Sequence, residues 1–161
     1  MKEEIVNQYR HFWKTYEKIV FDFDEKSWLM SGFGLTTPAS LAFHILQSTK
    51  YYMKDSTAFV FQTGETCDSD CSKLNDCDLP DKEDILFLVG DVQVKSEKWL
   101  QKMVLKSENH NFGWTGKNNL SVALFLIRHN QFHLGEMNAL LNEYKKGKAK
   151  DHFAEALMLY K

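Results

Sequence analysis

The sequence lacks both a long apolar run and an excess of charge of one sign. Lysine and arginine number 20 against 22 aspartate and glutamate residues, which gives a formal net charge of −2. Proteins that bind nucleic acids usually need clustered basic residues to displace phosphate counterions, so we expect no nucleic-acid partner. No stretch approaches the roughly 18 apolar residues of a membrane span, and no apolar signal-peptide core follows Met1. We therefore expect a cytoplasmic protein with no membrane partner.

Cysteine is also scarce, and its distribution argues against a disulfide framework. Cys67, Cys71 and Cys77 fall within one aspartate-rich stretch, whereas the structural disulfides of a secreted domain are spread along its chain. An odd, clustered set indicates reduced thiols on a solvated loop. The alternative is a second metal site or a redox switch, although no fourth regularly spaced ligand completes a zinc motif.

Proline is nearly absent, which leaves long stretches free to form helices. Its two occurrences, Pro38 and Pro80, each precede a long helical pattern, and proline is tolerated in the first turn of a helix but not in its interior. Apolar residues recur every three or four positions after each proline and in two further segments, a spacing typical of helices with one buried face. The helices expected from this pattern cover residues 2–23, 38–54, 80–103 and 120–145.

The remaining segments have the composition of connections. Residues 24–37, 63–79 and 107–119 contain the glycine, asparagine, aspartate and serine residues that favour turns. A short closing helix is expected over 151–161, and no segment alternates with the two-residue period of a strand. The sequence therefore predicts one all-α domain over residues 1–161, a four-helix bundle with long connections after its second and third helices.

Three histidines interrupt the apolar faces of these helices. His44 lies on the inward face of the second helix, and His129 and His133 lie one turn apart on the inward face of the fourth. An imidazole in such a place buries two ring nitrogens, and leaving either unpaired costs about 1–3 kcal/mol. A single core histidine is more often hydrogen-bonded to a neighbour, but one ion satisfies all three rings together. We predict a divalent transition metal held by these residues.

Two residues next to the histidine pair add to this hypothesis. Glu136 is a candidate catalytic base toward a bound ligand, or an acceptor for the proton of a ring nitrogen. The alternative is a partly exposed helix glutamate. Gly135 in a helix interior costs about 0.8–1.0 kcal/mol relative to alanine, so we expect another helix or a ligand to approach there closely.

The segment from Ile127 to Leu141, which contains these residues and Arg128, resembles the fourth-helix signature of the DinB/YfiT-like superfamily. The segment from Pro38 to Tyr52 resembles its second-helix signature, and the resemblance extends over the chain in order and length. It implies a four-helix bundle with a three-histidine metal site, zinc or nickel as the usual ion, and a homodimer. Where the family usually has glutamine after the glycine of the fourth helix, this chain has Glu136.

The resemblance also implies a class of chemistry. The family includes transferases that use low-molecular-weight thiols such as bacillithiol or mycothiol, alongside members with no assigned activity. Three neutral imidazoles leave an open coordination position for water or a thiol, whose pKa a divalent ion lowers. We therefore expect a metal-dependent enzyme that acts on a small-molecule substrate, as a thiol-dependent S-transferase or a hydrolase. The alternative is a non-catalytic metal-binding, ligand-binding or interaction bundle.

Overall fold

The periodic apolar segments form four long helices in the computed structural model, which describes the backbone of residues 1–157 and their side chains, except those of Cys77 and residues 155–157. The prediction of a mostly helical protein is confirmed. The long helices are α1 (Lys2–Asp22), α3 (Pro38–Met53), α4 (Lys82–Lys102) and α5 (Asn119–Tyr144). The short elements are α2 (Glu25–Trp28), β1 (Phe59–Val60), β2 (Thr66–Cys67), η1 (Cys71–Lys73), η2 (Asp76–Asp78), η3 (Gly113–Thr115) and α6 (His152–Leu157), where η denotes a 3₁₀ helix.

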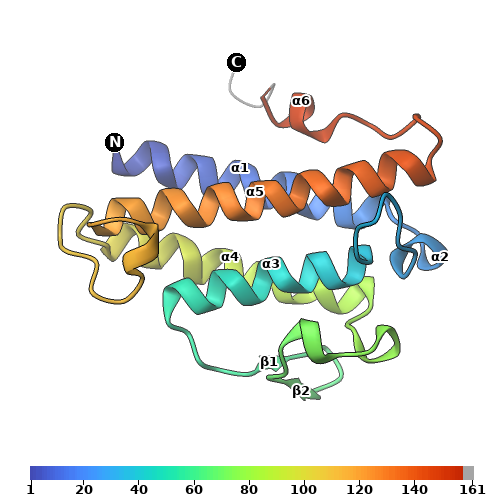
Figure 1. Ribbon diagram of the computed structural model, residues 1–161, viewed down its shortest axis with the longest axis horizontal. Helices are drawn as coiled ribbons and strands as arrows, with labels where there is room; N and C mark the ends of the chain where they lie inside the picture. Colours follow the sequence, from blue (N-terminus) through green and yellow to red (C-terminus); the bar gives the residue numbers. More distant parts are fainter. Residues whose placement is uncertain (158–161) are drawn as a thin grey trace.

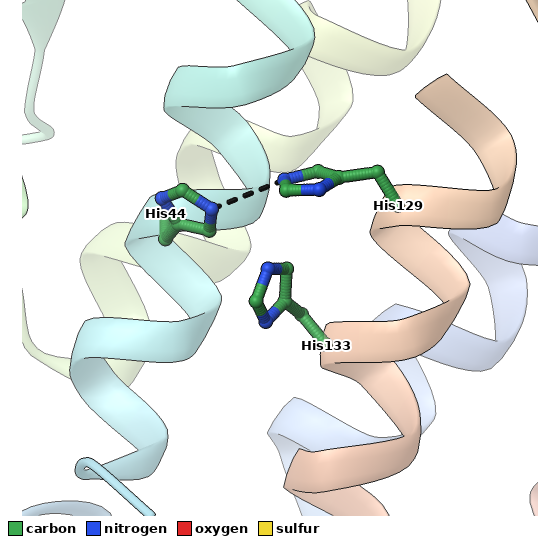
Figure 2. Close-up of side chains that lie close together, drawn as sticks. All are labelled: His44, His129 and His133. Atoms are coloured by element: carbon green, nitrogen blue, oxygen red, sulfur yellow. Dashed lines mark hydrogen bonds between the residues drawn. The ribbon is translucent and has the colours of Figure 1, made fainter. Parts of the chain in front are cut away.

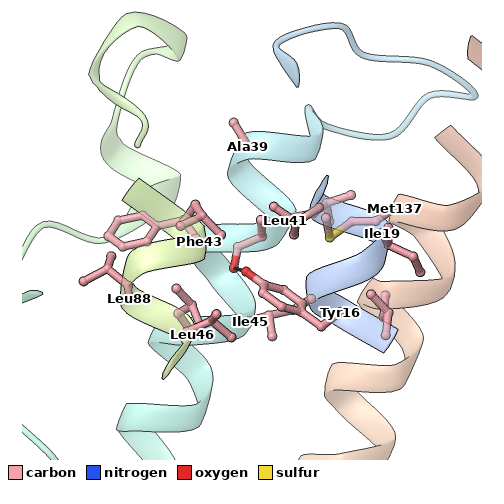
Figure 3. Close-up of a cluster of buried hydrophobic side chains, with 14 of the residues drawn as sticks. Tyr16, Ile19, Ala39, Leu41, Phe43, Ile45, Leu46, Leu88 and Met137 are labelled. Atoms are coloured by element: carbon pink, nitrogen blue, oxygen red, sulfur yellow. Dashed lines mark hydrogen bonds between the residues drawn. The ribbon is translucent and has the colours of Figure 1, made fainter. Parts of the chain in front are cut away.

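The long helices pack side by side (Figure 1). Both α1 and α3 contact α4 and α5. Their apolar faces meet in the cluster shown in Figure 3, which includes Tyr16 of α1, Ile45 of α3 and Met137 of α5. All three side chains are removed from solvent, and burying a side chain of this size contributes roughly 1.5–3 kcal/mol. The apolar stripes of the sequence therefore hold the helices together.

The aromatic residues of this interior keep their polar groups satisfied. The hydroxyl of Tyr16 donates to the carbonyl oxygen of Ala42 at 3.0 Å, and the indole Nε1 of Trp13 donates to Oγ of Ser96 at 3.1 Å. A buried donor without a partner would cost about 1–3 kcal/mol. These bonds allow large aromatic side chains to fill the interior without that penalty.

A buried polar network sets α3 and α5 in register. Asn130 of α5 has no exposed surface. Its Nδ2 donates to Oγ1 of Thr49 at 2.8 Å, and its Oδ1 accepts from Oγ of Ser48 at 3.1 Å. Sliding one helix along the other would break both bonds inside the protein. The network thus determines which turn of α3 lies opposite the histidine pair of α5.

Side-chain caps define where α3, α4 and α5 begin. The side-chain oxygens of Thr37, Asp81 and Asn118 each accept a hydrogen bond from the backbone nitrogen three residues later. Such a cap contributes about 1 kcal/mol. Because Asp81 is the capping residue, α4 begins at Lys82, and the expectation that this helix starts at Pro80 is wrong by two residues.

The connection between α3 and α4 departs from the expectation that no strand is present. Phe59 pairs with Cys67 and Val60 with Thr66 in a short antiparallel ladder. Two residues per strand are too few to produce a detectable alternation in the sequence. The ladder nevertheless positions Phe59, which is 7% exposed, against the helices.

Two further expectations are corrected or limited by the structure. A Cβ atom added at Gly135 would meet no atom within 4 Å, so the expected close approach by another helix is wrong. The closing helix α6 docks on α1, with His152 Nε2 at 2.9 Å from Asp22 Oδ2, while positions 158–161 of the expected helix lie outside the described residues. Within residues 1–157, no helix is long and apolar enough to cross a membrane.

Candidate metal centre

The three histidines singled out from the sequence come together between α3 and α5 (Figure 2). His44 projects from α3, and His129 and His133 project from successive turns of α5. The Nε2 atoms of His44 and His129 are 3.1 Å apart, and one ring nitrogen of each histidine lies within 4.8 Å of the others. The ring centroid of His44 lies 5.2 Å from that of His129 and 4.7 Å from that of His133, and the centroids of His129 and His133 are 4.6 Å apart. The three rings therefore form one cluster that could hold a metal ion.

The spacing of the rings matches what an ion of the zinc type requires. Zn–N bonds of 2.0–2.1 Å in a tetrahedral site place ligand nitrogens about 3.3 Å apart. The separation between His44 and His129 is close to this value, and a ring nitrogen of His133 lies within 4.8 Å of both. The three side chains are partly buried, so the cluster is reachable from solvent.

The second ring nitrogens of two histidines have their own partners. Nδ1 of His133 lies 2.7 Å from Oε2 of Glu136, and Nδ1 of His44 lies 3.9 Å from Sγ of Cys71. A proton on Nδ1 is donated to such an acceptor, which leaves the lone pair of Nε2 for a cation. The tautomer that metal binding needs is thus favoured at His133, whose partner is a carboxylate. Glu136, for which the sequence left several roles open, lies in the position of the acceptor.

The surroundings favour neutral imidazoles. Burial, reinforced by the neighbouring His133 and His44, lowers the pKa of His129 to about 4. Burial also lowers the pKa of His44, again with a contribution from His133. Only a neutral imidazole can donate its lone pair to a metal, so at neutral pH these two rings are ready to bind without losing a proton.

The metal-free protein should lose stability as the pH falls from about 6.5 to about 4. In this window the unfolded chain protonates its histidines near their ordinary pKa, whereas folded His129 stays neutral down to about 4. The unfolded state therefore binds more protons, and the free energy of unfolding rises with pH. Urea denaturation at several pH values, with a chelator present, measures this slope.

The variant His129→Gln tests the assignment, because glutamine retains a polar side chain but does not titrate. Between pH 6.5 and 4, the variant's free energy of unfolding should change less steeply with pH than that of the natural protein. The difference should correspond to about one proton fewer taken up on unfolding. His110→Gln is the matched control, because His110 is 73% exposed. Equal slopes for the natural protein and His129→Gln would contradict the lowered pKa.

Sequence reasoning missed the role of the connection that precedes α4. The thiols were expected on a solvated loop, but Cys71 is only 7% exposed and lies against His44. Burial raises the pKa of Cys71, so its thiol is neutral, and Cys67 and Cys71 are both free of disulfides. The only sign in the sequence was the residue type itself, since cysteine is among the residues most often buried.

A second feature that the sequence did not reveal is the packing around His129. The ring of Phe125, one turn earlier on α5, lies 6.0 Å from that of His129 at an interplanar angle of 12°. The two rings are nearly parallel, and Nε2 of His129 faces Nε2 of His44. An aromatic side chain thus packs beside one member of the cluster.

Comparisons with known proteins identify no relative of this chain. No family model matches the chain, and no curated protein matches it either. The resemblance of its second and fourth helices to the DinB/YfiT-like superfamily therefore stays a prediction, and the function is inferred from the residues of the site.

Proposed function

We propose that the protein is a metal-dependent enzyme of the DinB-like four-helix-bundle type, with a divalent ion held by His44, His129 and His133. Zinc and nickel are the candidate ions. The proposed reaction is transfer of a low-molecular-weight thiol to a small-molecule substrate, or hydrolysis of that substrate. A cytoplasmic location, a homodimer and the lack of nucleic-acid and membrane partners belong to the same proposal.

The observation that carries the proposal is the convergence of three ring nitrogens from two helices. Three neutral nitrogen ligands without a fourth protein ligand are typical of catalytic zinc, whereas structural zinc is enclosed by four. Three histidines with unrelated structural roles would have no reason to bring their ring nitrogens within 4.8 Å of one another. The carboxylate of Glu136 at Nδ1 of His133 also matches the outer partner that metal-binding histidines usually have.

A bound divalent ion would polarise a water or thiol at its open position and lower the pKa of that ligand. The chain's own residues prepare the site for it. Glu136 accepts the proton on Nδ1 of His133, and the ring of Phe125 stacks against that of His129. A further role of Glu136 as a catalytic base toward a bound ligand stays a prediction.

The first experiment measures metal content in protein purified without a metal-affinity column. Elemental analysis should find close to one zinc or nickel ion per chain, and titration of the chelator-treated protein with each ion should saturate at the same ratio. Absence of stoichiometric metal in both measurements would overturn the proposal. Use of a tag-free chain prevents added histidines from contributing to the result.

A second measurement separates catalysis from binding. Metal-loaded and chelator-treated protein are compared for conjugation of several thiols to an electrophile such as monochlorobimane, and for hydrolysis of activated esters. Turnover that depends on the metal supports the enzyme. Stoichiometric metal without turnover in any assay would overturn the catalytic part and favour the non-catalytic binding bundle.

Glu136→Ala should weaken metal binding by about 10–100-fold, the usual loss when the outer partner of a metal-binding histidine is removed. The reason is that Nδ1 of His133 loses the acceptor at 2.7 Å that sets its tautomer and orientation. Competition with a chromophoric chelator measures the affinity.

Two companion variants make this prediction specific. Glu136→Gln keeps an oxygen that accepts a hydrogen bond, so it should retain more affinity than the alanine variant. Glu143→Gln changes an exposed carboxylate on the same helix and should bind metal like the natural protein. A Glu136→Ala affinity equal to that of Glu143→Gln would remove Glu136 from the site.

A further inference from the structure

A cleft of about 630 Å³ opens beside His44 and His129, between α3, α5 and the segment 55–72. Figure 1 shows the β1–β2 part of this segment beside α3. The volume lies within the range of roughly 300–1,000 Å³ that is typical of small-molecule sites. Because two of the clustered histidines line the cleft, a molecule bound there can reach an ion held by them.

Aromatic rings form much of the wall of this cleft. Tyr51, Tyr52, Phe59 and Phe125 all line it. The rings of Tyr51 and Tyr52 are 5.3 Å apart, and those of Tyr52 and Phe125 are 5.4 Å apart. Tyr51 is 57% exposed and Phe59 is 7% exposed, so the aromatic wall extends from the surface into the interior. Such a wall favours a flat, apolar ligand.

The wall contributed by the segment 55–72 is held in place by specific bonds. Nε2 of Gln47, on α3, donates to the carbonyl oxygen of Ser69 at 2.6 Å. Oε1 of the same side chain accepts from the backbone nitrogen of Cys71 at 3.0 Å. Phe59 packs against Phe43 of α3, with ring centroids 5.1 Å apart. The cleft is therefore a built feature of the fold.

The charges around the cleft disfavour a negatively charged ligand body. Among the residues that the structure describes, Lys50 is the only lysine or arginine that lines the cleft, and it is 5% exposed. Nζ of Lys50 donates to both oxygens of Thr57 at 2.6 and 2.9 Å and lies 3.4 Å from Asp55, so its charge is already balanced. Asp68 and Asp70 line the cleft as well, and both are exposed.

We propose that this cleft binds the body of a small molecule that is flat, apolar and either neutral or positively charged, with a metal-coordinating group directed toward His44 and His129. The proposal rests on the metal site proposed above, whose ion would bind the coordinating group. The aromatic wall selects the shape of the body, and the two exposed aspartates select against an anion.

Hydroxamates that share one metal-coordinating group test the selection. Protein loaded with Co²⁺ is titrated with acetohydroxamate, benzohydroxamate, 4-carboxybenzohydroxamate and 4-(aminomethyl)benzohydroxamate, and the visible spectrum of the ion reports binding. Benzohydroxamate should bind about tenfold more tightly than acetohydroxamate, after correction for their affinities for free Co²⁺, because it buries a ring. The aminomethyl compound should bind at least about three times as tightly as the carboxy compound. The factor is small because exposed charges are screened.

Variants assign these preferences to the cleft. Tyr51→Ala removes an exposed ring, so it should reduce the gain from the benzene ring without unfolding the protein, and Phe59→Leu is a second variant of the same wall. Phe21→Ala is the control, because Phe21 is an exposed aromatic residue of α1.

The charge preference is tested by a separate pair of double variants. Asp68→Asn combined with Asp70→Asn should abolish the charge preference. Asp76→Asn combined with Asp78→Asn changes two aspartates outside the cleft and should retain it.

The possible failures are distinguishable. If the protein takes up no Co²⁺, the proposed metal site is overturned. If it binds Co²⁺ but shows equal corrected affinities for acetohydroxamate and benzohydroxamate, the metal site stands and the proposal for the cleft is overturned. An unchanged ring preference in both Tyr51→Ala and Phe59→Leu would equally exclude this aromatic wall as its source.

Discussion

His129→Ala is expected to abolish stoichiometric metal binding and the stabilisation that metal provides. His129 contributes the Nε2 atom that lies 3.1 Å from that of His44, so its loss leaves two ligands in place of three. A ligand present at about 1,000 times its dissociation constant stabilises the folded state by about 4.1 kcal/mol. The natural protein should therefore gain several kcal/mol in unfolding free energy on metal loading, and the variant should gain almost none.

The measurement combines elemental analysis with denaturant unfolding in the presence of metal and of a chelator. His110→Ala is the matched control, since this exposed histidine lies in the connection before α5 and should leave both quantities unchanged. The chelator-treated proteins should unfold at similar denaturant concentrations, which shows that the variant still folds. Equal metal content in the natural protein and His129→Ala would end the chelation hypothesis.

Asn130→Asp is expected to destabilise the protein by about 3–5 kcal/mol at neutral pH, the cost of a buried charge without a partner. Asn130 has no exposed surface, and its amide nitrogen donates to Thr49 Oγ1. A carboxylate has the same shape but cannot donate that bond, and it introduces a negative charge into the interior. The variant should also bind metal more weakly, because the register of α3 against α5 is loosened.

Urea denaturation of Asn130→Asp and of a control measures the effect. Asn142→Asp makes the same chemical change at an exposed position of α5, so it should cost no more than about 1 kcal/mol. Burial raises the pKa of the new carboxyl, so the deficit should shrink as the pH falls and the group becomes neutral. A deficit that is the same for both variants would show that Asn130 does not organise the interface.

The helices were largely predictable because their determinants are local. Apolar residues every three or four positions define the buried faces, and Thr37, Asp81 and Asn118 cap the helices through bonds to residues three positions away. Errors arose where the determinant was not periodic. The two-residue strands are too short to show a pattern, and the capping role of Asp81 moves the start of α4 beyond Pro80.

The candidate site was predictable only in part. His129 and His133 are one turn apart, so any helix brings them to the same face. The sequence also suggested His44 from its inward position, but its distance from the other two depends on how α3 packs against α5. For Glu136 the sequence left several roles open, and the structure places its carboxylate 2.7 Å from Nδ1 of His133.

The sequence by itself determined the helical segments, the shared face of His129 and His133, and the polarity of the connections, because each depends on spacing within a few residues. Only the tertiary structure decided that His44 meets that pair, that Cys71 lies against His44, and that the segment 55–72 lines a cleft beside them. These contacts depend on the packing of large side chains and on hydrogen bonds such as those of Asn130 and Gln47, which join residues more than twenty positions apart. Local sequence patterns do not predict which distant residue each of these groups contacts.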